Sequence, residues 1–275
     1  MRLLFFCFLV LLFGVSCIKE KSIEIDISSP TGDTCHLIKL VQGTDTVLNL
    51  FYDQKGRLVK LTDLDVPSND IDSLIATFNS AGLVSSVRWD SPSPLEVFYD
   101  YSGTRIIKMK LIDPFRLADS AVYTFEYGAG TKPLRKNLYS YSSFTSGGLF
   151  EYYLFTYDSK GNISTKETFW AAGQLKETIV FTYTDQANSF RSLSYFSDPF
   201  NVFDMQNAID AEACWNENDA ASAIYTNANG DIIRQKKISY EKDSKGRVVT
   251  VKSETYYLAP GDGESFNYTF FYNCN

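Results

Sequence analysis

Hydrophobic and polar residues alternate with a period of two along much of this chain. Phe155 and Tyr157 share one face of their segment, for example, while Thr156 faces the other side. Such an alternation places successive side chains on opposite faces of a β-strand, whereas the faces of a helix repeat every 3.6 residues. The pattern therefore predicts a chain built mainly from strands.

A short polar stretch that ends in or near glycine separates these strands. Seven copies span residues 51–58, 77–83, 98–104, 125–130, 155–163, 181–185 and 238–248, and 224–230 is a candidate eighth. In Asp53-Gln54-Lys55-Gly56 the carboxylate can accept the backbone N–H two residues on, and glycine can take the left-handed conformation that closes a bulged hairpin. Near-identical acidic motifs repeated along one edge of a sheet indicate turns rather than catalysis, because an active site needs one set of residues that differs from the rest.

The repeat glycines are spaced for pairs of strands. Gly56, Gly82, Gly103, Gly130 and Gly161 lie 21 to 31 residues apart, which leaves room for two strands and a second turn at the opposite edge. We therefore predict an all-β fold, a long antiparallel up-and-down meander that is curved or partly closed into a barrel.

The strand rhythm stops near residues 197–221, where we expect a short helical or loop insert. This insert contains Phe200, Phe203 and Trp215 together with several carboxylates. Long inserts often have a binding role, but aromatic side chains are first of all large apolar surfaces. We favour a cap that buries these rings over a binding loop.

The N-terminus predicts export from the cell. Arg2 precedes an apolar run that is too short to span a membrane as a helix, and small residues follow it up to Cys17. The ending Val15-Ser16-Cys17 resembles a bacterial lipoprotein signal, which implies that Cys17 becomes lipidated; Gly14 stands where that signal usually has leucine. Ordinary secretory cleavage at the same place, which would release an unlipidated chain, is the alternative. We divide the chain into a signal peptide (1–16), a lipidated N-terminus and tether (17–45) and a single β domain (46–275).

Composition and charge exclude several functions. The formal net charge of −7 argues against nucleic acid as a partner. The chain has a single histidine and lacks the hydrolase, metalloprotease and phosphate-loop motifs, so we expect no catalysis, no cofactor and no metal site. In an oxidising compartment one disulfide can form among Cys35, Cys214 and Cys274, but the sequence does not say which pair forms it.

Two recurring motifs resemble the YD-repeat class: Tyr52-Asp53-x-x-Gly56-Arg57-Leu58 and Tyr157-Asp158-x-x-Gly161-Asn162-Ile163. Together with the leader, they resemble small Gram-negative lipoproteins described as having a porin-like β fold. The resemblance covers roughly residues 46–275 and blurs at Tyr183, where the glycine is missing. It implies a long curved or partly closed meander, and it implies no reaction and no catalytic residues.

These features predict a membrane-anchored lipoprotein of the cell envelope with a structural or interaction role. We expect it to be held at the outer membrane by its lipid, facing the periplasm or the cell surface, with an envelope protein or a glycan as partner. A secreted soluble periplasmic protein is the alternative location. A carbohydrate-binding module is the alternative function, with Trp89, Trp170 and Trp215 as its first candidates. A barrel that crosses the membrane is disfavoured because charge falls on both faces of the segment containing Arg234, Lys236 and Lys237.

Overall fold

The structure is a computed structural model that describes residues 35–65, 70–90, 95–112, 120–141, 147–189, 215–258 and 263–274. These residues form sixteen strands. Their bounds are β1 Cys35–Gln42, β2 Asp45–Tyr52, β3 Leu58–Asp65, β4 Asp70–Phe78, β5 Val84–Asp90, β6 Leu95–Ser102, β7 Arg105–Ile112, β8 Ser120–Tyr127, β9 Pro133–Tyr141, β10 Leu149–Tyr157, β11 Ile163–Trp170, β12 Leu175–Ala187, β13 Asn218–Asn227, β14 Ile232–Lys242, β15 Val248–Tyr257 and β16 Gly263–Cys274.

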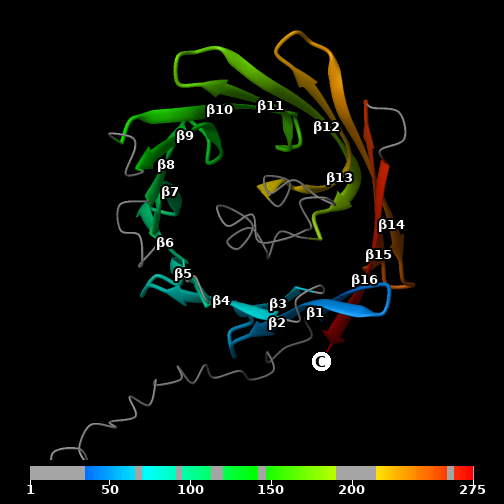
Figure 1. Ribbon diagram of the computed structural model, residues 1–275. Coiled ribbons are helices and arrows are strands. Elements are labelled where there is room, and N and C mark those ends of the chain that lie inside the picture. Colours follow the sequence, from blue (N-terminus) through cyan, green and yellow to red (C-terminus); the bar gives the residue numbers. More distant parts are fainter. Residues whose placement is uncertain are drawn as a thin grey trace, which may run out of the picture.

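The strands form one closed barrel (Figure 1). Each strand pairs antiparallel with its neighbours in the sequence, and β1 pairs with β16 from Cys35↔Cys274 to Gln42↔Tyr268. The predicted all-β meander is confirmed, and its closure is complete. No helix in the part of the chain described here is both long and apolar enough to cross a membrane.

The connections alternate between the two ends of the barrel. At one end, which we call the repeat end, six of the seven copies join an even-numbered strand to the next strand, and the seventh, 181–185, lies within β12 near the same end. The candidate eighth copy, 224–230, joins β13 to β14 and therefore lies at the opposite, far end. Its Asn227 side chain accepts the same type of backbone N–H bonds, which explains the similar sequence, but the strand that enters this turn runs in the opposite direction.

The turns have the predicted chemistry. Asp53 Oδ1 accepts the backbone N–H of Lys55 and of Arg57, each at 2.9 Å, and Gly56 has a φ of 72°. Asp158 and Asp243 make the same bonds in their own turns. A residue with a Cβ in place of Gly56 would be strained in this left-handed conformation.

Two predicted boundaries differ from the structure. β1 lies within the range 17–45 assigned to the tether, so the barrel includes residues from Cys35 onward that were placed outside the β domain. β13 begins at Asn218, which makes the last four residues of the predicted insert (197–221) part of a strand. The rest of that insert up to residue 214, with Phe200, Phe203 and Cys214, lies outside the described residues, as do the leader and Cys17.

The two faces of the wall differ in polarity. Side chains that point into the barrel are largely apolar and buried, and the main cluster joins β1–β8 with β13–β16; its members include Leu40, Leu61, Val97, Met109 and Val251. On β14 the buried Lys236 and Ile238 alternate with the exposed Lys237 and Ser239. The interior is therefore the hydrophobic face of the sheet.

Candidate functional site

A ring of tyrosines surrounds the repeat end. On every even-numbered strand except β4, the last tyrosine donates its hydroxyl to a backbone carbonyl near the start of the preceding strand, at 2.7 to 2.8 Å. The bonds are Tyr52 to Leu37, Tyr101 to Val84, Tyr127 to Ile106, Tyr157 to Pro133, Tyr183 to Ile163, Tyr240 to Ala220 and Tyr272 to Val248. Phe78 takes this place on β4. Burial raises the pKa of Tyr272 to about 12, so its hydroxyl keeps its proton.

Basic side chains cover several of these rings. The Arg57 guanidinium lies 4.1 Å from the centre of the Phe78 ring, and Arg247 lies 5.4 Å from that of Tyr272. Arg105 covers Tyr127 and Lys132 covers Tyr157 in the same way. Each basic residue follows a repeat turn, and the ring that it covers lies near the end of the next even-numbered strand. For Arg57, Arg105 and Lys132 that strand leads into the next repeat turn, so these turns are linked around the mouth. Arg247 instead links its turn to β16 at the seam. The sequence contained part of this signal, in Tyr52-Asp53 before a turn and Arg57 after it, but it did not show which ring the cation would meet.

We expect Tyr157→Phe to lower the free energy of unfolding by about 1 kcal/mol, because the carbonyl of Pro133 loses its donor in a partly buried site. Urea unfolding followed by tryptophan fluorescence measures this change. Tyr152→Phe on the same strand is the matched control, since Tyr152 lies on the outer face against Phe169. Equal effects of the two substitutions would contradict the role of the ring.

Asn162 organises the place where the chain leaves the barrel wall. Its side chain is fully buried, donates to Asp158 Oδ2 and to Asn218 Oδ1, each at 3.0 Å, and accepts the backbone N–H of Glu217 and of Asn218. In the equivalent position of other turns stand Arg57 and Arg247, which bind their own turn aspartate. The turn at Asp158 therefore anchors residues 217 and 218 instead of a neighbouring ring.

The residues that follow β12 and those that precede or begin β13 are bonded to the barrel wall and to each other. Asn216 Oδ1 accepts the backbone N–H of Ile163 at 2.6 Å, and the amide side chain of Asn188 donates to the carbonyl of Asn216. Asp219 accepts the backbone N–H and the hydroxyl of Ser189. Burial raises the pKa of Asp219, although the bonds from Ser189 oppose this change. The chain thus leaves and re-enters the wall at one fixed place on the repeat end.

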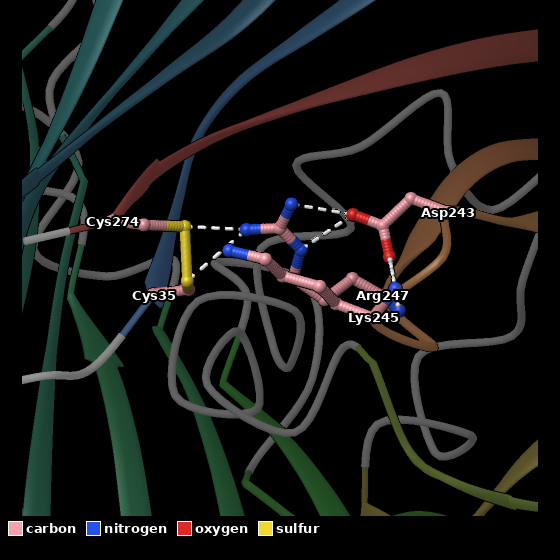
Figure 2. Close-up of a disulfide and its surroundings, with 5 residues drawn as sticks. All are labelled: Cys35, Asp243, Lys245, Arg247 and Cys274. Atoms are coloured by element: carbon pink, nitrogen blue, oxygen red, sulfur yellow. Dashed lines mark hydrogen bonds and ion pairs between the residues drawn. A yellow bond between two sulfur atoms is a disulfide. The ribbon is translucent and has the colours of Figure 1, made fainter.

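The barrel seam is closed by a disulfide between Cys35 and Cys274 (Figure 2). This pairing answers the question that the sequence left open, and it joins the first residue of β1 to the last of β16. Arg247 Nη1 lies 3.1 Å from Cys35 Sγ and contacts Cys274 Sγ more closely. Asp243 holds the guanidinium in place through Nε at 2.6 Å and through Nη2. A hydrogen bond from the Arg247 side chain lowers the pKa of Asp243, so the aspartate keeps its charge.

A pocket of about 420 Å³ opens at the repeat end beside this seam. Its walls include Cys35, His36, Tyr52, Arg57 and Phe78. The His36 imidazole packs at 4.6 Å on the Tyr52 ring, and Arg57 is ion-paired with Asp53. The lining gives apolar and aromatic surface with a basic edge, which suits the binding of a small group or a side chain.

The three predicted tryptophans lie in different places. Trp89 on β5 packs against the main interior cluster, and Trp215 packs inside the barrel with its ring 6.2 Å from that of Phe125. Trp170 ends β11 at the far end, where it is 41% exposed and meets Phe150 edge to face at 5.9 Å. The structure therefore does not bring them together into one site.

An interior lysine that the sequence did not single out lies near Trp215. Lys136 on β9 is 3% exposed, and its ammonium lies 4.9, 5.0 and 5.7 Å from the rings of Tyr123, Tyr153 and Trp215. Aromatic faces attract a desolvated cation strongly. Trp215 therefore helps to accommodate a buried charge inside the wall.

The outer face has charged pairs across neighbouring strands. Opposed residues include Arg88↔Glu96, Asp100↔Lys108, Glu126↔Arg135 and Lys237↔Glu254. Ion pairs link Asp100 to Lys108 at 4.0 Å and Glu126 to Arg135 at 3.6 Å. Charge thus lies within the strands themselves, on the face opposite to the apolar core.

Two solved structures resemble this barrel. A porin-like protein from Bacteroides uniformis ATCC 8492 has a TM-score of 0.58 at 11% sequence identity, over 89% of this chain and 99% of that chain. A porin-like protein from Bacteroides vulgatus ATCC 8482 has a TM-score of 0.52 at 13% identity, over 87% of this chain and 99% of that chain. No family model and no curated protein matches the chain. The likeness supports the expected porin-like β fold, and membership of the YD-repeat class stays a prediction.

Proposed function

We propose that this chain is a lipid-anchored protein of the bacterial cell envelope, whose barrel lies in water and serves a structural or interaction role without catalysis. The observation that carries the proposal is the polarity of the wall, with apolar side chains inside and charged pairs outside. A barrel that crosses a membrane needs the reverse arrangement, an outward apolar band about 25 Å tall. Each lysine or arginine at the middle of a lipid-facing wall costs about 2–4 kcal/mol.

Three strands illustrate this cost. Lys108 lies in the middle of β7, Lys237 in the middle of β14 and Lys252 in the middle of β15, all on the outer face. Their outward neighbours include Asp100, which pairs with Lys108, and Glu254, which pairs with Lys252. An outer face of this kind favours water, so attachment to a membrane requires a separate anchor, for which Cys17 is the candidate.

We expect Cys17→Ser to move the protein from the membrane pellet to the soluble fraction of lysed cells, because the variant has no residue to accept the lipid. Immunoblotting of the two fractions measures the shift. Cys214→Ser, which alters another cysteine of the chain, is the control and should stay in the pellet. A Cys17→Ser protein that remains in the pellet would refute the anchor, and wild-type protein in the soluble fraction would favour the secreted alternative.

A carbohydrate-binding role is the second candidate, and the exposed edge-to-face pair of Trp170 and Phe150 favours it. Exposed rings can stack on the apolar faces of sugars, and the Lys176 ammonium lies 4.4 Å from the Trp170 ring centre. If the role is correct, Trp170→Ala should weaken binding on a glycan array at least tenfold, while Phe98→Ala, an exposed ring on β6, should leave it unchanged. Wild-type protein that binds no glycan on the array would eliminate this function.

A further inference from the structure

The seam disulfide has the surroundings of a reactive site. Both cysteines are exposed, and the Arg247 guanidinium contacts both sulfur atoms (Figure 2). We propose that Cys35–Cys274 is a thiol–disulfide exchange site for a dithiol reductant. In this reaction an incoming thiolate attacks Cys35 Sγ from the repeat-end pocket, and Cys274 leaves as a thiolate that Arg247 stabilises. The proposal does not depend on the lipid anchor.

The placement of Arg247 is fixed by its neighbours. Asp243 binds its Nε at 2.6 Å, and the Tyr272 ring lies 5.4 Å from the guanidinium carbon. A cation held beside a cysteine lowers the pKa of its thiol and favours the reduced state, since it attracts a thiolate more strongly than a neutral disulfide. Exposed disulfides are also those most open to exchange.

The two sulfur atoms are not equivalent. Cys35 forms part of the pocket wall, next to His36 and Leu37, so a thiolate has access to it from that side. Cys274 is the sulfur nearer to Arg247 Nη1. Exchange is fastest when the leaving sulfur is the better stabilised thiolate. The geometry therefore favours attack at Cys35 and departure of Cys274.

The reaction balances without a further redox partner. The incoming thiolate forms a bond to Cys35 Sγ, and the electron pair of the Cys35–Cys274 bond goes to Cys274 Sγ. The second thiol of the reductant loses its proton to water, and the resulting thiolate attacks the reductant sulfur that is bonded to Cys35. Cys35 is released as a thiolate that takes up a proton, and the reductant has become a disulfide by losing two electrons.

A redox titration with dithiothreitol tests the role of Arg247. Full-length protein is equilibrated with mixtures of reduced and oxidised dithiothreitol, and mass spectrometry of the linked peptides follows this disulfide alone. We expect Arg247→Met to make reduction about tenfold less favourable, equivalent to a midpoint about 30 mV more negative. Arg247→Lys should restore much of the wild-type value, because it keeps the charge.

Arg105→Met is the matched control. Arg105 follows a repeat turn and covers the Tyr127 ring at 5.4 Å, as Arg247 covers Tyr272, and it does not line the pocket beside the disulfide. General weakening of a repeat turn would affect both variants and would ease reduction rather than oppose it. An Arg247→Met midpoint equal to that of the wild type or of Arg105→Met would overturn the proposal.

A trapping experiment tests which sulfur is attacked. Wild-type protein is exposed briefly to reduced glutathione, quenched in acid, alkylated and digested, and the glutathione-bearing peptide is identified. We expect glutathione mainly on Cys35 and the alkyl group mainly on Cys274. Equal labelling, or glutathione mainly on Cys274, would contradict the assigned direction.

Discussion

A variant with both Cys35 and Cys274 replaced by serine is expected to lose about 5 kcal/mol of unfolding free energy. The disulfide joins residues 239 positions apart, so it removes a large amount of conformational freedom from the unfolded chain. The effect on the unfolded chain is separate from the ease of reduction, which the contacts of the folded state determine. Few other changes in this barrel should have an effect of this size.

Urea unfolding of wild type and variant, with tryptophan fluorescence as the signal, measures the loss. The single variants Cys35→Ser and Cys274→Ser should each match the double variant, because either one removes the same bond. Wild-type protein in a strong reductant should approach the same stability. A loss below about 1 kcal/mol would mean that the unfolded chain is already restricted in other ways.

Asn162→Ala is expected to lower the unfolding free energy by about 3 kcal/mol. The substitution removes the acceptor of two backbone N–H groups, at Glu217 and Asn218, and the donor to Asp158 and Asn218. Buried backbone donors left without partners cost about 1–3 kcal/mol each. The Asn162 side chain is fully buried, so bulk water does not reach these donors to replace its contacts. The loss should come with faster proteolysis near residues 188 and 217, where the chain leaves and rejoins the wall.

Asn227→Ala is the control for this prediction. Asn227 makes the corresponding turn bonds to Asn229 and Asp231 at the exposed far end, where water can replace the lost contacts. We expect it to cost about 1 kcal/mol. If both asparagine variants lose the same free energy, the network at Asn162 is only an ordinary turn.

Local turn chemistry explains how much of the fold was predictable. The hairpin turns are fixed by contacts within five residues, made by Asp53, Asp158 and Asp243, so the local sequence motifs predict these turns directly. Closure depends instead on the pairing of β1 with β16, more than 200 residues apart, and no local pattern records such a pairing. The candidate copy at 224–230 shows the converse, since identical turn chemistry does not reveal at which end of a barrel it lies.

The candidate sites were less predictable for the same reason. The targets of Tyr157 and Arg247 lie on neighbouring strands or across the seam, and their distances follow from register rather than from composition. Trp215 was chosen as an aromatic residue in an insert, but it packs in the interior beside a buried lysine, a neighbour that cannot be inferred from its own segment. Cys35 and Cys274 became a pair because the register places them opposite each other.

The ring of tyrosines has a consequence for the growth of such proteins. Each two-strand unit except the one that ends in β4 has a tyrosine hydroxyl that bonds to the preceding strand, and several also have a cation that covers the ring of the next unit. A unit of this kind can be duplicated or deleted without a new type of contact between strands. Because the width of a barrel increases with its number of strands, duplication of one unit would give a wider barrel with the same hydroxyl bonds and cation–ring contacts between its strands.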